Sequence, residues 1–218
     1  MLLSNEKWFG YAFSLKRMWA KFILLSNGIF IKKKVYLDWN TINGPVVYCA
    51  NHTSYIDIVI SYVVVPKYFS YMGKKELQKI PLFNIFFKRM NILVDRKNKH
   101  ESHKALLQSA EQVDKGNSMF LYPEGTFNRE GKLLPLKKGA FRLAIQKQIP
   151  IIPITFIDNW KRMQSGGFFK AKGGPGFTKA IIHKPIDTKG LTEEDLLPLL
   201  NKVHTIFATD LQQHGNNE

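Results

Sequence analysis

The sequence has a single cysteine and no long apolar run. Cys49 has no second cysteine with which to form an internal disulfide, so nothing in the chain requires an oxidising compartment. The longest uncharged stretches near the N-terminus, residues 8–15 and 22–31, are well short of the roughly 20 apolar residues that span a bilayer. Basic residues interrupt this apolar region and no small-residue cleavage site follows, so we expect neither a transmembrane helix nor a secretory signal.

The sequence is also poor in acidic residues, which leaves a large positive charge. Against 17 Asp and Glu stand 32 Lys and Arg, giving a formal net charge of +15. On a compact body, this charge attracts phosphates, nucleic acid or an anionic membrane. No recognised nucleic-acid-binding motif is present, so we expect an anionic membrane surface as the partner and no nucleic acid. The 218 residues, 44% of them hydrophobic, can bury one sizeable core.

The N-terminal segment, residues 1–33, is predicted to associate with the membrane through an amphipathic helix. Its apolar side comprises Trp8, Tyr11, Ala12, Leu15, Met18, Trp19 and Phe22, and its polar side Lys7, Ser14, Arg17 and Lys21. A helix packed on the core and a helix in the membrane interface both fit this pattern. The tryptophans and basic flanks favour the interface. We therefore expect a peripheral protein on the cytoplasmic face of a membrane.

The remainder, residues 34–218, alternates apolar strands with helical stretches and is predicted to be one α/β domain with a mainly parallel central sheet flanked by helices. The expected strands are residues 34–39, 45–50, 68–73, 91–95, 118–122, 151–157 and 179–185, and the expected helices residues 55–65, 74–88, 100–115, 138–148 and 192–212. Thr192 is the candidate N-cap of the last helix, with Asp195 three residues later, and Pro198 makes its first turn irregular.

The stretch "NHTSYID", residues 51–57, follows an apolar strand and carries the first candidate site. In an open α/β sheet the functional crevice lies beyond the carboxyl ends of the strands, where His52 is expected. Asp57 in the first helical turn could hold one imidazole nitrogen and leave the other to take a proton, as in a general-base pair. Alternatively, Asn51, Thr53 and Ser54 cap the helix and His52 is merely polar. A Ser54-His52-Asp57 triad is disfavoured because three members so close in sequence leave little freedom of placement.

Other strand ends supply further candidates. Gly125 and Thr126, in "YPEGT", could present backbone N–H groups to an anion, and Arg96 could bind a phosphate with two hydrogen bonds. An ordinary turn, and a salt bridge of Arg96 with Asp95 or Glu124, are the structural alternatives. Metal ligation by His52 and Asp57 together with His100 and His103 is disfavoured because the last two lie in a strongly polar stretch. No metal site is therefore expected.

Four segments together resemble one family. "NHTSYID", "ILVDR", "YPEGT" and "IPIIPI" occur in the order and approximate spacing of the blocks of glycerolipid acyltransferases, and "LPLKKGAFRLA" fits between the last two. Over residues 45–157 the chain is similar to the 1-acyl-sn-glycerol-3-phosphate acyltransferase family. The resemblance implies transfer of a fatty acyl group from an acyl thioester, of coenzyme A or acyl carrier protein, to the hydroxyl of a lysophospholipid, with no further cofactor.

The resemblance also implies roles for single residues. It makes His52 the base that deprotonates the acceptor hydroxyl and Asp57 the residue that orients the imidazole. Phosphate and glycerol binding fall to Arg96, Glu124, Gly125 and Thr126, and acyl-chain access to Ile151, Ile152, Pro153 and Ile154. The chemistry also needs donors for a tetrahedral oxyanion, and the backbone of residues 53–57 or of Gly125 is the expected source.

Two positions depart from the family pattern. Met90 stands where glycine usually begins the second block, and Phe127 stands where arginine usually follows the threonine of the third. Loss of that arginine weakens the predicted phosphate site. Arg129, Lys137 or Lys138 could compensate, or the acceptor could be another lysolipid, such as a lyso-aminolipid. A non-enzymatic membrane adaptor with the same fold is the remaining alternative.

Overall fold

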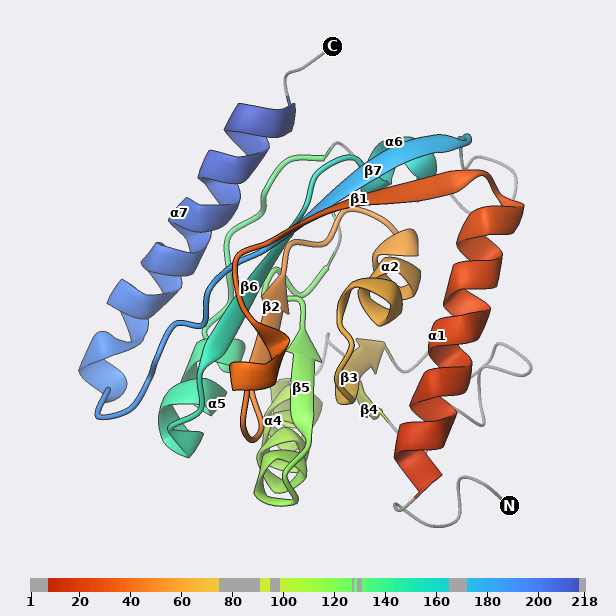
Figure 1. Ribbon diagram of the computed structural model, residues 1–218. Coiled ribbons are helices and arrows are strands. Elements are labelled where there is room, and N and C mark those ends of the chain that lie inside the picture. The colour runs from red at the N-terminus through yellow and green to blue at the C-terminus, as the bar shows by residue number, and fades with distance from the viewer. Residues whose placement is uncertain are drawn as a thin grey trace.

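The computed structural model describes residues 8–74, 91–94, 99–126, 128, 131–164 and 172–215 (Figure 1). The strands are β1 Ile29–Val35, β2 Val47–Ala50, β3 Phe69–Lys74, β4 Ile92–Val94, β5 Ser118–Leu121, β6 Ile151–Phe156 and β7 Gly176–Ile182. The helices are α1 Phe9–Ser26, α2 Ile56–Val64, α4 Lys99–Asp114, α5 Gly139–Lys147, α6 Asn159–Arg162 and α7 Leu196–Gly215. Short 3-10 turns occur at Trp39–Thr41 and Glu193–Asp195.

The strands form one sheet in the order β1-β7-β6-β2-β5-β3-β4. Every neighbouring pair is parallel except β6 and β7, which run antiparallel. Strands β2, β5 and β6 are buried along their whole length, as expected for a parallel sheet covered on both faces. The predicted α/β class with a mainly parallel sheet is confirmed.

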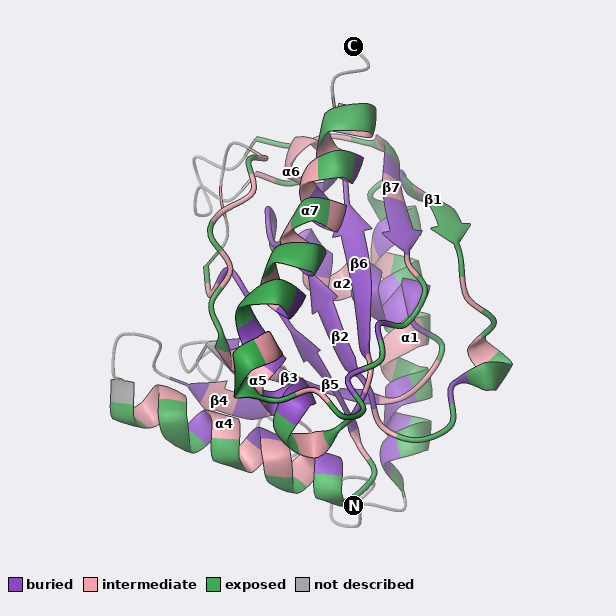
Figure 2. Cartoon of the chain, turned by 90° about the vertical axis from the view of Figure 1, so that its left-hand side faces the viewer, coloured by how far each residue is buried: buried purple, intermediate pink, exposed green. Residues whose placement is uncertain are grey.

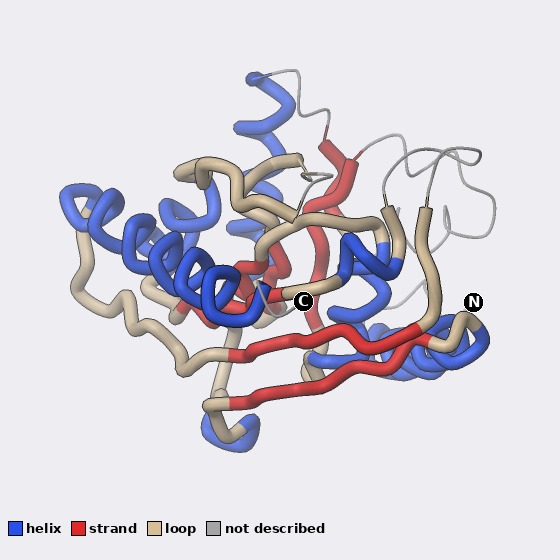
Figure 3. Tube along the Cα trace, turned by 90° about the horizontal axis from the view of Figure 1, so that it is seen from above, coloured by secondary structure: helices blue, strands red, loops and turns tan. Residues whose placement is uncertain are grey.

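Two layers of helices cover the sheet. Helices α1 and α2 pack on one face, where Tyr48, Phe120 and Phe156 are among the fully buried side chains. Helices α4, α5 and α7 pack on the other face, around Met119 and Phe141. Figure 2 shows α7 crossing in front of β6, and Figure 3 shows β1 and β7 side by side at one edge, with α1 and α7 on opposite sides. This arrangement leaves the ends of the central strands as the places where polar side chains can gather.

The first strand corrects the predicted domain boundary. A strand was expected at residues 34–39, but β1 begins at Ile29 and pairs along its whole length with β7. Its lysines, Lys32, Lys33 and Lys34, are tolerated because β1 is an edge strand, and that lysine run hides the apolar pattern in the sequence. The boundary predicted between residues 33 and 34 therefore falls inside the sheet and is wrong.

Helix α1 lies against the domain and also exposes apolar side chains. It packs through Phe9, Ala12, Phe13, Ala20 and Leu24, and the ring of Phe13 contacts Phe69 with centroids 5.0 Å apart. Its exposed apolar stripe comprises Trp8, Tyr11, Leu15, Met18, Trp19, Phe22 and Leu25. Apart from buried Ala12, the predicted apolar side thus points to solvent. Arg17, from the predicted polar side, donates to the carbonyl of Tyr62 instead. The helix is packed on the core, and its membrane role stays a prediction.

Most predicted helices occur within a few residues of their expected bounds. The predicted capping box is present, since Thr192 and Asp195 bond each other's backbone N–H groups. Helix α7 then starts at Leu196, so Pro198 lies in its first turn, where a proline is tolerated. The helix predicted at residues 74–88 lies outside the described residues, apart from Lys74, which ends β3. Within the part of the chain that the structure describes, no helix is long and apolar enough to cross a membrane.

Candidate active site

His52 lies beyond the carboxyl end of β2, where the sheet predicts a functional crevice. The preceding residue, Asn51, fixes this exit. Its side-chain amide donates to the carbonyl of Phe156 at 2.8 Å and accepts the N–H of Phe156 at 2.7 Å. Because this pair joins the ends of β2 and β6, the backbone leaves the sheet at a defined point. Asn51 therefore links the ends of β2 and β6, and the alternative in which it caps α2 is wrong.

His52 and Asp57 form the predicted pair. Nδ1 of His52 is 2.7 Å from Oδ2 of Asp57, which lies in the first turn of α2. The same oxygen accepts the backbone N–H groups of Thr53 at 2.8 Å and Ser54 at 2.9 Å. Asp57 is completely buried and His52 nearly so. An ionised Asp57 holds the proton on Nδ1, so Nε2 is the nitrogen that can accept one.

Ser54 does not act as a nucleophile in this arrangement. Its hydroxyl donates to the carbonyl of Met163, and its oxygen accepts the N–H of Ile56 at 3.2 Å. These bonds give Ser54 a capping and bridging role, as one alternative predicted. The disfavoured Ser54-His52-Asp57 triad has no support in this geometry.

Glu124 holds the backbone of His52. Its two carboxylate oxygens accept the backbone N–H groups of His52 at 2.7 Å and of Leu134 at 2.9 Å. Burial raises the pKa of Glu124 to about 7, against the lowering effect of the two backbone hydrogen bonds. The family resemblance implied that Glu124 binds substrate, and its hydrogen bond with the backbone of His52 was not predicted. Its contact with substrate stays a prediction.

The turn after Glu124 differs from the predicted anion cradle. The N–H of Gly125 donates to the carbonyl of Tyr122 at 3.0 Å, so this N–H is already hydrogen-bonded within the turn. Thr126, the next residue, is exposed to solvent. Gly125 has a φ of +71°, and a Cβ there would come within 2.6 Å of Nζ of Lys137. Glycine therefore leaves room for the Lys137 side chain, whose ammonium group lies against this turn.

The predicted oxyanion donors are also largely occupied. Within residues 53–57, Asp57 Oδ2 takes the N–H groups of Thr53 and Ser54, Ser54 Oγ takes that of Ile56, and the Ser54 carbonyl takes that of Asp57. Together with the bond of Gly125, this removes five of the backbone groups from the prediction. The amides build the His52-Asp57 turn and do not point to a reacting carbonyl.

Tyr122 covers one face of the base. Its ring stacks on the His52 imidazole with centroids 3.9 Å apart and planes inclined by 16°. Tyr122 immediately precedes Pro123 at the end of β5 and is buried, and burial raises its pKa well above the ordinary value. The sequence analysis assigned no function to Tyr122, although its position directly after a buried strand could have indicated that it lies near His52.

The predicted acyl-chain residues do not share one surface. Ile152 and Ile154 belong to the core under α1 and α2, whereas Ile151 belongs to the core under α5 and α7. Successive side chains of a strand point to opposite faces, so residues 151–154 cannot all line one pocket. The prediction is wrong for the four as a set. A role for Ile152 and Ile154 stays a prediction.

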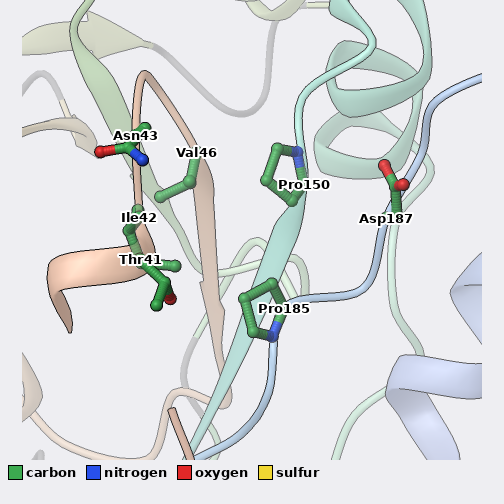
Figure 4. Close-up of a pocket in the computed structure, with 7 residues that line it drawn as sticks. All are labelled: Thr41, Ile42, Asn43, Val46, Pro150, Pro185 and Asp187. Carbon is green, nitrogen blue, oxygen red and sulfur yellow. The ribbon is translucent and has the colours of Figure 1, made fainter. Parts of the chain in front are cut away.

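A separate cavity lies at the opposite end of the sheet. Figure 4 shows its lining, and its volume is about 260 Å³. The lining residues are Thr41, Ile42, Asn43, Val46, Pro150, Pro185 and Asp187. Val46 and Pro150 immediately precede β2 and β6, whereas His52 follows β2, so this cavity is not adjacent to the base.

Asn159 is a functional candidate that the sequence reasoning missed. It is the first residue of α6, completely buried, and its Nδ2 donates to Oδ1 of Asp57 at 2.6 Å. Its place just after the buried strand β6, in "IDNW", resembles the place of His52 after β2 and was the available signal. Arg96, Met90, Phe127 and Arg129 lie outside the described residues, so the predictions that involve them stay untested. Among the described residues, no group of three acidic, His or Cys side chains is arranged to hold a metal ion.

Comparisons with known proteins agree on one family. The acyltransferase family model matches residues 26–157. The chain is 32% identical over 204 residues to the 1-acyl-sn-glycerol-3-phosphate acyltransferase of Haemophilus influenzae, covering 92% of this chain and 78% of that protein. It is 30% identical over 186 residues to the enzyme of the same name from Saccharomyces cerevisiae, covering 84% of this chain and 60% of that protein.

A solved structure supports the fold. The crystal structure of the 1-acyl-sn-glycerophosphate (LPA) acyltransferase PlsC from Thermotoga maritima superposes with a TM-score of 0.79 at 24% identity, over 98% of this chain and 83% of that one. This likeness shows the fold, and the family is shown by the family-model match and by the H. influenzae relative. The chain therefore belongs to the acyltransferase family, together with the 1-acyl-sn-glycerol-3-phosphate acyltransferases.

Proposed function

We propose that this protein transfers a fatty acyl group from an acyl thioester to the free hydroxyl of lysophosphatidic acid, giving phosphatidic acid for phospholipid synthesis. The observation that carries the proposal is the buried His52-Asp57 pair at the carboxyl end of β2, in a chain of the acyltransferase family. The names of the H. influenzae and S. cerevisiae relatives support lysophosphatidic acid as the acceptor.

The proposed mechanism needs one base and no covalent acyl-enzyme intermediate. Nε2 of His52 takes the proton of the acceptor hydroxyl as the oxygen attacks the thioester carbonyl carbon. The tetrahedral intermediate collapses, the carbon–sulfur bond breaks, and the departing thiolate takes the proton back from the imidazolium. Asp57 stays ionised throughout and stabilises the imidazolium, with its Oδ2 bonded to Nδ1. Acyl coenzyme A and acyl carrier protein are both suitable donors because each presents an activated thioester.

We propose that the ammonium group of Lys137 binds the phosphate of the acceptor. The ammonium group lies against the Gly125 turn, which follows Glu124, and Glu124 in turn holds the backbone of His52. Lys137 also donates its backbone N–H to the carbonyl of Pro123 at 2.8 Å, which fixes its Cα at the same turn. An ammonium group beside the Gly125 turn compensates for the arginine that the family pattern has at position 127 and this chain lacks.

The membrane is the proposed source of the acceptor. The apolar stripe of α1 exposes Tyr11 at 65%, Met18 at 66% and Phe22 at 68%, on the side of the helix turned away from the core. Aromatic and aliphatic side chains of this kind lie well in a bilayer interface, and the net charge of +15 favours anionic lipid. We propose peripheral attachment through this stripe, on the cytoplasmic face.

The test is acyl transfer from a labelled acyl thioester to lysophosphatidic acid in detergent micelles. The native protein is expected to form phosphatidic acid, and His52→Ala and Asp57→Asn are each expected to lose about 10²- to 10⁴-fold of the rate, as for removal of a general base. Circular dichroism and thermal unfolding check that both variants stay folded. If the protein acylates another lysolipid, such as a lyso-aminolipid, and not lysophosphatidic acid, the proposed acceptor is wrong and the proposed reaction type stands. No transfer to any acceptor would refute the enzymatic function.

A further inference from the structure

We infer that Asn159 and Thr178 are positioning residues for the catalytic pair: together they form a hydrogen-bonded relay that sets the orientation of the Asp57 carboxylate. This inference rests on the proposed function, because it concerns the residue that orients the base. The relay comes from a part of the chain remote from the His52 turn, since Asn159 is 102 residues from Asp57.

The two oxygens of Asp57 have different surroundings. Oδ2 accepts from His52, Thr53 and Ser54, all within its own turn. Oδ1 accepts from Asn159 at 2.6 Å. Because Asp57 is completely buried, loss of this donor would leave a carboxylate oxygen unpaired away from water, which is costly. The bond therefore fixes the plane of the carboxylate, and with it the direction in which Oδ2 meets the imidazole.

Thr178 pairs with the acceptor end of the Asn159 amide, whose donor end faces Asp57. An amide has one donor end and one acceptor end, and an ionised carboxylate can only accept. The hydroxyl of Thr178 donates to Oδ1 of Asn159, which leaves Nδ2 directed at Asp57. Thr178 and Asn159 are both buried, at 1% and 0% exposure. The hydroxyl thus donates to the amide and the amide donates to the carboxylate, so the two hydrogen bonds run in one direction and each strengthens the other.

The fold explains why these residues meet. Asn159 follows the end of β6, and Thr178 lies in β7, the antiparallel neighbour of β6. A second bond joins the same region to the His52 turn, from the Ser54 hydroxyl to the carbonyl of Met163. Two residues that follow β6, Asn159 and Met163, are therefore bonded to the His52-Asp57 turn, at Asp57 and at Ser54.

The experiment compares two changes at one position. Thr178→Val removes the hydroxyl with little change of shape, and Thr178→Ser keeps it. We expect Thr178→Val and Asn159→Leu to lower kcat about 10- to 100-fold, the range for misoriented catalytic groups, with KM for both substrates unchanged within about twofold. Thr178→Ser should retain a kcat near the native value. Combined with Asp57→Asn, Asn159→Leu should cause little further loss, because both changes act through the same carboxylate.

A spectroscopic readout separates this inference from the acyltransfer proposal. The Nδ1 proton of His52, observed by NMR in ¹⁵N-histidine-labelled protein, should change its chemical shift in Thr178→Val and Asn159→Leu and keep it in Thr178→Ser. Equal behaviour of the Val and Ser variants in both kcat and chemical shift would overturn the relay. A loss seen only in KM would also overturn it. An inactive native protein with the expected shifts would refute the proposed function and retain the relay.

Discussion

The carboxylate of Glu124 accepts a hydrogen bond from the backbone N–H of His52 at 2.7 Å, across 72 residues of sequence. His52 is therefore held at two points, at its imidazole by Asp57 and at its main chain by Glu124. The turn after β5 and the turn after β2 behave as one unit. This unit gives the Glu124 carboxylate a structural role, whether or not it touches substrate.

Glu124 gives the first prediction, a pH-dependent contribution to stability. Burial raises its pKa from 4.5 to about 7, so the folded protein favours the protonated form. The stability from this group is fully present below pH 4.5 and is lost as the pH rises through about 7. At about 1.4 kcal/mol for each pH unit, the loss is roughly 3 kcal/mol at most. Glu124→Gln has no such titration, so its stability relative to the native protein should improve between pH 5 and pH 8.

Urea unfolding of both proteins at pH 5, 6, 7 and 8 measures this difference. The exposed carboxylate of Glu193 provides the control, because its pKa is lowered by the hydrogen bond from Arg142. Glu193→Gln should show a constant difference from the native protein across the same range. A constant difference for Glu124→Gln as well would contradict the raised pKa.

The second prediction concerns acceptor binding by Lys137. Its neighbour Lys138 is also exposed, but it is the N-cap residue of α5 and lies near Glu193, so it provides a matched control. Lys137→Ala should raise KM for lysophosphatidic acid about tenfold, as for loss of a charged hydrogen bond, and Lys138→Ala should change it less than about twofold. Monoacylglycerol lacks the phosphate, so neither change should affect its KM. If both substitutions raise KM for lysophosphatidic acid equally, Lys137 does not bind the phosphate specifically and acts only through the overall positive charge.

The sequence predicted the parts of the site that are local in the chain. Asp57 follows His52 by five residues, and one helical turn after a strand brings the two together, so the pair could be recognised without the rest of the fold. The strands of the central sheet were visible for a similar reason, because strands buried on both faces are continuous apolar runs.

The contacts that the sequence missed join distant segments. The links of Glu124 to His52 and of Asn159 to Asp57 span 72 and 102 residues, and they depend on which strands are neighbours in the sheet. A buried asparagine after a strand has many satisfactory partners, so its sequence position alone does not identify one. The side of α1 that packs on the core was missed for another reason. Both of its long sides are apolar, and only packing shows that Phe13 points inward and Phe22 outward.

The third prediction tests membrane attachment through α1. The double variant Met18→Glu, Phe22→Glu places charges on two exposed positions and should leave the fold intact. Binding to vesicles of phosphatidylglycerol and phosphatidylcholine should fall at least about tenfold, because a buried apolar side chain contributes about 1.5–3 kcal/mol. The matched control, Leu107→Glu with Leu197→Glu, adds the same charge at exposed leucines of α4 and α7. Equal losses in a vesicle co-sedimentation assay would assign binding to net charge and not to the α1 stripe.

The fourth prediction concerns the attachment of α7, where Asp210 bonds two groups of the sheet. Its Oδ2 accepts from His183 Nε2 at 2.7 Å and from the hydroxyl of Thr155. Burial alone would raise the pKa of Asp210, but the hydrogen bonds from His183 and Thr155 lower it below 3.8. Its contribution to stability is therefore present above pH 3.8 and is lost as the pH falls through the lowered pKa.

Asp210→Asn should lower the free energy of unfolding by about 2 kcal/mol at pH 7, as for loss of a charged hydrogen bond, and by less under acid conditions. The control Asp114→Asn removes a surface pair with Lys147 and should cost less than about 1 kcal/mol. Denaturant unfolding at pH 7 and pH 3 measures both, and equal costs for the two variants at pH 7 would show that Asp210 does not stabilise the α7 contact.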